Sequence, residues 1–356
     1  MSVVPESPYG VDGIPRFTKP DFDNKSQVDK IADAFKDQGV VVITDFFDEE
    51  FCNDKMERMV SSFEKLGSGV DRNDMDTWKP ENLPPQTRPG MYQGIVANNP
   101  EVWEVRRDED YQRLYKEMYL RIKPDTFKAK DKLVPSIDGV NIKPDRLSPF
   151  RKSNSVDWAH IDQTKRGDTY ACIQGQVVLS ESDACFRCSP RSHRVFEPIL
   201  DLLNISTTDK SNWVKISGKG KEEIEAQCRF LVEGAGGKWQ VPVKVPAGSV
   251  ILWLSTCVHS ARLAEKPKSE FHKGNSWHGW RGVFYICFRP ENELNTKDKS
   301  RHQKCIDENR TTNHWGTKLF EKNRTGRFMG DQMYHPAVAN YIRNPELWYN
   351  IVGKPQ

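Results

Sequence analysis

The chain has 356 residues, of which 37% are hydrophobic and 10% aromatic, so it can bury a substantial core. Lys and Arg total 53 against 50 Asp and Glu, which gives a net charge of +3. That balance argues against a dedicated nucleic-acid binder, because such binding depends on clustered positive charge. No apolar run approaches the roughly 20 residues of a membrane-spanning helix. We therefore expect neither nucleic acid nor a membrane as a partner.

Signals for targeting are missing at both ends of the sequence. The first residues lack the basic and apolar stretches of a secretory signal, and the final Gly353-Lys354-Pro355-Gln356 is not a peroxisomal signal. A cytoplasmic location is the expectation. The 8 cysteines, several of them in apolar strand-like segments, are then expected to be reduced and mostly buried thiols.

Helical periodicity dominates the first third of the chain. An extended arm, residues 1–25, leads into a predicted helix that Ser26 opens, with Asp29 as a capping partner, and that Gly39 ends. A buried strand follows over 40–44, and Asp48 is the expected N-cap of a second helix. A third helix is predicted over about 108–121. The stretch 68–99 between the last two helices is a long, proline-rich loop.

From Leu133 onward the pattern changes to short β-rich runs separated by turns. Such a pattern indicates a sandwich or barrel. After residue 291 a polar stretch extends to about 330, and a short helix is expected at about 336–342. We interpret 1–356 as a single domain with an arm (1–25), a helical part (26–130), a β core (131–290) and a C-terminal extension (291–356). The predicted strands lie within 133–143, 169–180, 212–217, 239–245, 249–255 and 281–289.

One short motif carries the clearest chemical signal. His160 and Asp162 are two residues apart on a predicted extended segment, so their side chains point to the same face and can bind one metal ion. His259, which follows the apolar run 250–254, is the best candidate for a third ligand. Two histidines and one carboxylate leave other metal positions open, as in the facial triad of non-haem Fe(II) oxygenases.

The order of the motifs adds a resemblance to a known family. A helix and the strand Gly39-Val40-Val41-Val42 come first, then His160-Ile161-Asp162, the turn 189–194, the turn and strand leading to His259, and finally Arg281. In this order, over about residues 26–290, the chain resembles the phytanoyl-CoA dioxygenase-like family of Fe(II)/2-oxoglutarate dioxygenases. The resemblance implies a mainly β fold with flanking helices, namely a double-stranded β-helix or cupin-like jelly roll.

The resemblance also implies roles for the matched residues. His160, Asp162 and His259 would bind Fe(II), and Arg281 would bind the distal carboxylate of the co-substrate 2-oxoglutarate, for which a guanidinium is well suited. With O2, such an enzyme hydroxylates an unactivated C–H bond of a small or medium-sized organic substrate. It releases succinate and CO2.

Two departures from the family pattern keep alternatives open. The spacer of 21 residues between His259 and Arg281 is long, so Arg262 and Arg289 are alternative anchors. In the 189–194 turn, Arg191 replaces the usual glycine, and we expect His193 to be a structural residue.

A non-catalytic jelly-roll protein that retains the scaffold is the rival function. A metal-dependent cupin-type enzyme that does not use 2-oxoglutarate is the third.

Further candidates lie on predicted strands and in the long loop. Gln174 and Gln176 share one face of the strand 170–179, and buried glutamines need partners, so both are candidates for 2-oxoglutarate or substrate contacts. Asn141 has a similar but weaker position on an earlier strand. The loop 68–99 and the polar segment 264–277 are expected to form a lid, with residues 91–93 closest to the pocket.

Overall fold

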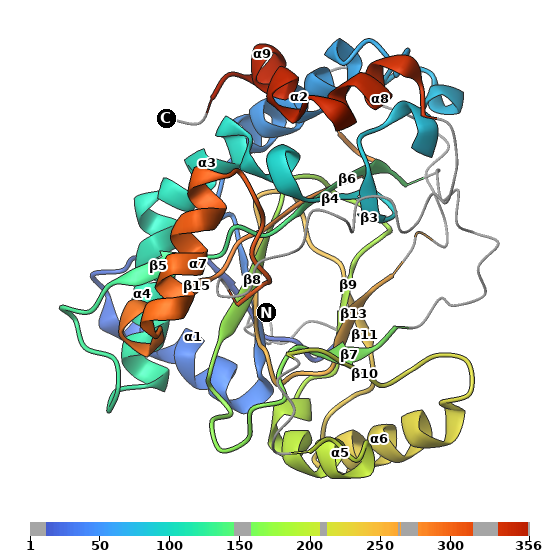
Figure 1. Cartoon of the computed structure of the whole chain (residues 1–356). Coiled ribbons are helices and arrows are strands. Elements are labelled where there is room, and N and C mark those ends of the chain that lie inside the picture. Colours follow the sequence, from blue (N-terminus) through green and yellow to red (C-terminus); the bar gives the residue numbers. More distant parts are fainter. Residues whose placement is uncertain are drawn as a thin grey trace, which may run out of the picture.

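The computed structural model describes residues 12–145, 158–206, 212–262, 264, 277–315 and 334–354. Two β-sheets form its centre, and helices flank them (Figure 1). In the large sheet the strand order is β1-β2-β12-β8-β14-β6-β4-β3, with β15 and β5 joined beside β8. In the small sheet it is β10-β7-β13-β9-β11. Across the described ranges, we find no helix with the length and apolar character needed to cross a membrane.

The strands are short, as the sequence predicted. Those of the large sheet are β1 Arg16–Thr18, β2 Val40–Thr44, β3 Gln86–Arg88, β4 Met91–Tyr92, β5 Leu133–Pro135, β6 Val140–Pro144, β8 Ile173–Val178, β12 Val250–Leu254, β14 Trp280–Tyr285 and β15 Phe288–Pro290. Those of the small sheet are β7 His160–Ile161, β9 Phe186–Cys188, β10 Val214–Lys215, β11 Val241–Val243 and β13 His259–Ala261.

The two sheets face each other. The ring of Phe186 on β9 lies 4.5 Å from that of Trp253 on β12, which joins the inner faces of the small and large sheets. Most strand pairs within each sheet are antiparallel, and strands distant in sequence lie side by side. The predicted mainly β fold with flanking helices, a cupin-like jelly roll, is confirmed.

The helices fall into three groups (Figure 1). In this view α1, α3, α4 and α7 lie along one side of the large sheet, α5 and α6 lie beyond the small sheet, and α2, α8 and α9 gather at the top. Their bounds are α1 Lys25–Gln38, α2 Glu49–Lys65, α3 Pro100–Arg107, α4 Glu109–Ile122, α5 Phe196–Leu202, α6 Glu222–Gly234, α7 Thr296–Asp307, α8 Pro336–Arg343 and α9 Trp348–Val352. Short 3-10 turns are η1 Met75–Thr77, η2 Pro80–Asn82, η3 Gly94–Asn98, η4 Ser192–Val195, η5 Glu291–Glu293 and η7 Pro345–Leu347.

Local signals explain most of the early elements. Gly39 ends α1 in the left-handed region, at φ 73°, where a residue without a Cβ is favoured. Asp48 caps α2, since its Oδ1 accepts a hydrogen bond from the Phe51 N–H at 2.7 Å. The predicted capping pair of Ser26 and Asp29 is wrong. Helix α1 begins one residue earlier, and the Asp29 carboxylate instead accepts from Arg121 Nε at 2.6 Å.

Helices α3, α5, α6, α7 and α9 were not predicted. Helix α7 lies in the stretch described above only as polar, and it buries just two side chains, those of His302 and Cys305. Helices α5 and α6 cover a second, smaller core behind the small sheet, formed with residues such as Ile161 and Val214. A helix that buries so narrow a face leaves a weak hydrophobic period in the sequence.

Register within the large sheet determines which side chains share the inner face. On the central strand β8, Gln174 pairs with Trp253 of β12, and Gln176 pairs with Tyr285 of β14. On the other side of β14, Arg281 pairs with Lys143 and Val283 with Asn141 of β6. Because side chains alternate along a strand, the polar members of these rows all face the space between the two sheets.

Candidate metal centre

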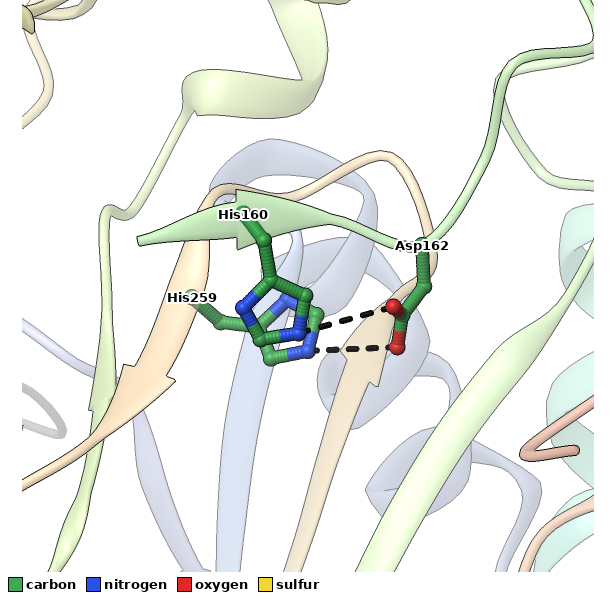
Figure 2. Close-up of side chains that lie close together, drawn as sticks. All are labelled: His160, Asp162 and His259. Atoms are coloured by element: carbon green, nitrogen blue, oxygen red, sulfur yellow. Dashed lines mark ion pairs between the residues drawn. The ribbon is translucent and has the colours of Figure 1, made fainter. Parts of the chain in front are cut away.

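The structure brings His160, Asp162 and His259 together in the small sheet. His160 of β7 pairs directly with His259 of β13, and Asp162 comes just after β7 (Figure 2). One ligand atom from each of the three residues lies within 4.8 Å of the other two. The Nε2 atom of each imidazole is 3.4 Å from an oxygen of the Asp162 carboxylate. This geometry can hold a metal ion between two nitrogens and one oxygen.

Hydrogen bonds orient each of the three side chains. Nδ1 of His160 lies 3.0 Å from the Trp158 carbonyl oxygen, and Nδ1 of His259 lies 3.0 Å from the Cys257 carbonyl oxygen. A carbonyl accepts only from an N–H, so the proton of each neutral ring is on Nδ1 and Nε2 is free to bind a metal. Gln174 Nε2 donates to Asp162 Oδ2 at 2.9 Å and fixes the carboxylate.

The electrostatics of the cluster favour the metal-binding protonation states. Burial, reinforced by the neighbouring His259, lowers the pKa of His160 to about 3. Burial alone would raise the pKa of Asp162, but the two histidines and the Gln174 hydrogen bond outweigh it and hold that pKa below its usual range. A neutral imidazole and an ionised carboxylate are the forms that bind a metal ion.

Aromatic rings pack against the two histidines. Trp158 stacks on His160 with ring centroids 4.6 Å apart, and Trp253 lies 5.4 Å from His259. The guanidinium of Arg88 lies 5.1 Å from the Trp158 ring, so the loop 68–99 reaches the site through β3. Tyr92 instead packs outward against Phe63 at 4.7 Å. Most of the proposed second lid segment, 264–277, falls outside the described residues.

Arg281 lies in a cavity between the two sheets. It is buried, its Nη1 donates to the Ala184 carbonyl, and its Nη2 donates to the Tyr285 hydroxyl at 3.3 Å. Gln176 and Phe186 also line this cavity. The two alternative anchors are already engaged with carboxylates, since Arg289 Nη2 lies 3.3 Å from Glu293 and Arg262 Nη2 lies 3.1 Å from Asp183. Arg281, in contrast, bonds a backbone carbonyl and a hydroxyl and has no carboxylate partner among the described residues.

The two polar residues on β6 differ in their surroundings. Asn141 Nδ2 donates to the Pro89 carbonyl at 3.3 Å, whereas its buried Oδ1 has no hydrogen-bond partner in the described part of the chain. Lys143, which sequence reasoning missed, is opposite Arg281, and its buried Nζ also has no partner among the described residues. Its two-residue spacing from Asn141 would have placed it on the same face. Gly90, at φ +73°, makes room for it, since a Cβ there would lie 2.7 Å from Lys143 side-chain carbons.

Lys143 should reduce the stability of the ligand-free protein. Burial is the main cause that lowers its pKa from 10.5 to about 8, with Arg281 adding to the shift and Asp145 opposing it. At pH 7 the folded protein must hold a buried charge that the unfolded chain exposes, at a cost of about 3 kcal/mol. We expect Lys143→Met to raise the free energy of unfolding by up to about that amount. Urea denaturation of both proteins measures the difference.

The pH dependence of that difference has a definite sign. Between pH 8 and 10.5 the unfolded chain binds more protons at Lys143 than the folded protein, so wild-type stability rises with pH relative to the Lys143→Met variant. The advantage of the variant should therefore be full below pH 8 and shrink as the pH approaches 10. A constant advantage across this range would show that Lys143 does not titrate with a lowered pKa.

The remaining sequence predictions concern the turn after β9 and the thiols. His193 is not part of the metal cluster, because its Nε2 bonds the Lys36 carbonyl at 2.9 Å, as expected for a structural residue. Arg191 occupies the turn position where the family has glycine, and it does adopt a positive φ of 65°. Its N–H donates to the Gln38 carbonyl at 2.7 Å, which helps hold this strained turn. All eight cysteines are free and buried, as predicted.

Comparisons with known proteins agree with the fold. No protein-family model matches the chain. Ava biosynthesis cluster protein O of Aspergillus versicolor is 24% identical over 307 residues, which cover 84% of this chain and 91% of that protein. The crystal structure of the hypothetical protein JW0805 from Escherichia coli aligns with a TM-score of 0.52 at 13% identity, over 83% of this chain and 76% of that one.

A second solved structure is similar to the same extent. The putative oxidoreductase from Salmonella typhimurium LT2 aligns with a TM-score of 0.50 at 13% identity, over 88% of this chain and 85% of that one. At such low identity these two likenesses support the fold and do not by themselves assign an activity. The activity has to be argued from the residues of the site.

Proposed function

We propose that the protein is an Fe(II)- and 2-oxoglutarate-dependent oxygenase that hydroxylates an unactivated C–H bond of a small or medium-sized organic molecule. The observation that carries the proposal is the arrangement of His160, Asp162 and His259. Both imidazoles keep Nδ1 on a backbone carbonyl and turn Nε2 toward the carboxylate, in a buried site. Two nitrogens and one carboxylate oxygen suit non-haem Fe(II) and leave positions for the co-substrate and O2.

The charges on the inner face of the large sheet support the choice of co-substrate. 2-Oxoglutarate is a dianion, and burying it requires cationic partners, because an unpaired buried charge is very costly. Arg281 and Lys143 face each other on β14 and β6, and both are buried. Arg281 would bind the distal carboxylate of 2-oxoglutarate, while Gln176 lines the same cavity and would contact the molecule along its length.

Each part of the site has a defined task in this proposal. Bound Fe(II), with 2-oxoglutarate and O2, supplies the oxidant that replaces a substrate C–H with C–OH while 2-oxoglutarate becomes succinate and CO2. Gln174 holds the Asp162 carboxylate in place by its hydrogen bond. The rings of Trp158, Trp253 and Phe186 exclude water around the ligands.

Two further considerations agree with this proposal. The motif order resembles the phytanoyl-CoA dioxygenase-like family, as described above. The similar Aspergillus versicolor protein belongs to a biosynthesis cluster, and one similar structure is called a putative oxidoreductase, both of which fit an enzyme that modifies small molecules. The rival proposal, a non-catalytic jelly-roll protein, gives no reason for two imidazoles that turn Nε2 toward one carboxylate or for the buried cation of Lys143.

Turnover of the co-substrate tests the proposed function without knowledge of the substrate. Oxygenases of this kind decarboxylate 2-oxoglutarate slowly when no substrate is bound. We expect the purified chain to convert 2-oxoglutarate labelled at its first carbon into labelled CO2 and an equal amount of succinate, with a strict need for Fe(II) and O2. His259→Ala, prepared in parallel, should be inactive. Equal product from wild type and His259→Ala would reject the proposal.

A further inference from the structure

The segment Arg310–Trp315, which follows α7, is held against the start of β6. The Thr312 N–H donates to the Ile137 carbonyl at 2.8 Å, and the Ile137 N–H donates to the Thr312 hydroxyl at 2.9 Å. The Cys287 thiol donates to the His314 carbonyl. These bonds fix the backbone on both sides of His314, so a residue of the C-terminal extension has a defined position within the barrel.

The imidazole of His314 lies beside the metal centre without belonging to it. Its ring stacks on Trp253 at 5.4 Å with an interplanar angle of 22°, and it meets the Tyr285 ring edge-on at 6.0 Å. The same Trp253 ring lies 5.4 Å from His259. One indole therefore contacts both a metal ligand and His314.

A carboxylate beside the imidazole of His314 favours one of the two neutral tautomers of the ring. Its Nδ1 lies 2.6 Å from Asp138 Oδ2, while Asp138 Oδ1 accepts from the Gly139 N–H at 2.6 Å. In the neutral ring the proton is on Nδ1, facing the carboxylate, so Nε2 is a hydrogen-bond acceptor. Both ring nitrogens are buried and neither makes a hydrogen bond of good geometry within the described residues; Nδ1 is in close contact with the Asp138 carboxylate, whereas Nε2 has no partner there.

Gln174 presents a second acceptor of fixed polarity. Its Nε2 donates to Asp162, which leaves Oε1 as the acceptor end of the amide, and Oε1 is buried without a partner in the described ranges. Gln174 pairs in register with Trp253, the residue on which His314 stacks. Gln174 and His314, each with a nitrogen beside a carboxylate and an acceptor without a partner in the described ranges, thus both neighbour one indole ring.

The co-substrate cannot satisfy these two acceptors. 2-Oxoglutarate has two carboxylates and a keto group, all of which accept hydrogen bonds at neutral pH. A buried acceptor left without a donor costs about 1–3 kcal/mol, so a ligand that supplies donors would be strongly favoured here. The rings of Trp253, Phe186 and Tyr285 around the acceptors suit a flat apolar body.

We propose that His314 and Gln174 bind the substrate, and that the substrate carries at least two hydrogen-bond donors, hydroxyl or N–H, on a flat apolar body that packs against Trp253. The inference rests on the proposed function and names the substrate class of that same site. The Asp138 carboxylate beside Nδ1 favours the tautomer in which Nε2 of His314 accepts a hydrogen bond. The C-terminal extension is therefore part of the substrate-binding site.

A graded series of probes tests this proposal. Resorcinol, 3-methoxyphenol and 1,3-dimethoxybenzene have the same ring and carry two, one and no hydroxyl donors. Their binding to the full chain loaded with Mn(II) and 2-oxoglutarate can be followed by the paramagnetic relaxation that Mn(II), standing in for Fe(II), causes in the probe protons. We expect binding near the metal and an affinity that falls about fivefold for each donor removed.

Two variants test whether His314 is responsible for the preference for probes with hydroxyl donors. His314→Phe keeps a ring for stacking on Trp253 and removes both nitrogens. In this variant the affinity should fall only about fivefold in total from resorcinol to 1,3-dimethoxybenzene. His314→Phe leaves the Asp138 carboxylate without its imidazole partner and could therefore fold poorly. The double variant Asp138→Asn/His314→Phe has no such carboxylate, and it should show the same reduced preference for probes with donors. Arg310→Ala changes the same segment at a residue whose guanidinium pairs with Glu308 at 2.7 Å, and it should keep the wild-type preference.

The outcomes separate this inference from the proposed function. A wild-type chain that binds neither Mn(II) nor 2-oxoglutarate would overturn both. A chain that binds both but relaxes none of the probes, or binds 1,3-dimethoxybenzene as tightly as resorcinol, would overturn only the substrate class. An unchanged preference in the folded His314→Phe and Asp138→Asn/His314→Phe proteins would remove His314 from the substrate site.

Discussion

Replacing His259 with alanine is expected to lower Fe(II) affinity by more than about a hundredfold, since even residues that only support a metal ligand contribute 10–100-fold. Asp162→Ala and His160→Ala should have effects of the same size, because each supplies one of the three ligand atoms gathered within 4.8 Å. Anaerobic equilibrium dialysis against Fe(II) measures the affinity of each variant. The matched control is His278→Ala, whose imidazole is 60% exposed and outside the cluster.

The pattern across the variants is more informative than any single loss. If the three residues form one site, each single variant should bind as weakly as the triple variant, while His278→Ala binds like wild type. Should His259→Ala retain wild-type affinity, His259 would not be a ligand, and the facial arrangement would have to be abandoned.

Replacing Arg281 with methionine is expected to raise the 2-oxoglutarate KM by about thirtyfold or more, because removing one partner of a buried charge pair costs 2–5 kcal/mol. Methionine retains much of the apolar length of the side chain, so the cavity wall is largely kept. The affinity for Fe(II) should stay near the wild-type value, since Arg281 has no contact with the three ligands in the described structure. Initial rates of succinate formation give the KM.

Arg289→Met is the matched control for that variant. Arg289 is half-buried on β15, the strand that follows β14 in the chain, but it pairs with Glu293 and lies 4.9 Å from the Trp315 ring. Its replacement should affect stability more than the 2-oxoglutarate KM. The opposite result, a raised KM in Arg289→Met with a normal KM in Arg281→Met, would move the anchor to Arg289.

Residues whose position follows from local periodicity were predictable from the sequence. The two-residue spacing of His160 and Asp162 placed both on one face, and the strand alternation placed Gln174 and Gln176 on the inner side of the barrel. Helix α1 and strand β2 followed from a helical period and the stop at Gly39. In each case a hydrophobic or polar period that spans about ten residues was enough to predict the position.

Residues whose position depends on long-range pairing could not be predicted. His314 lies in a polar stretch without periodicity, and its location depends on the hydrogen bonds between Thr312 and Ile137, which are 175 residues apart. Arg88 reaches Trp158 only because β3 and β4 extend the large sheet beyond β6. The sequence near these residues contains no signal of the strands that they meet.

The third reading, a cupin-type metal enzyme that does not use 2-oxoglutarate, would require the same three ligands. It would not require a buried guanidinium and a buried, unpartnered ammonium on neighbouring strands of the inner face. Arg281 and Lys143 therefore distinguish the two enzymes better than the metal ligands do. The co-substrate, rather than the metal, is the part of the account that most needs a direct measurement.

Anaerobic titration of the purified chain, first with Fe(II) and then with 2-oxoglutarate, tests the central claim most directly. Chelation of Fe(II) by a 2-keto acid gives a visible charge-transfer absorption band that neither component shows alone. The account predicts binding of one Fe(II) per chain, followed by a saturable band on addition of 2-oxoglutarate, and loss of the band in His259→Ala. Binding of Fe(II) without any band at saturating 2-oxoglutarate, or a band that survives in His259→Ala, would contradict it.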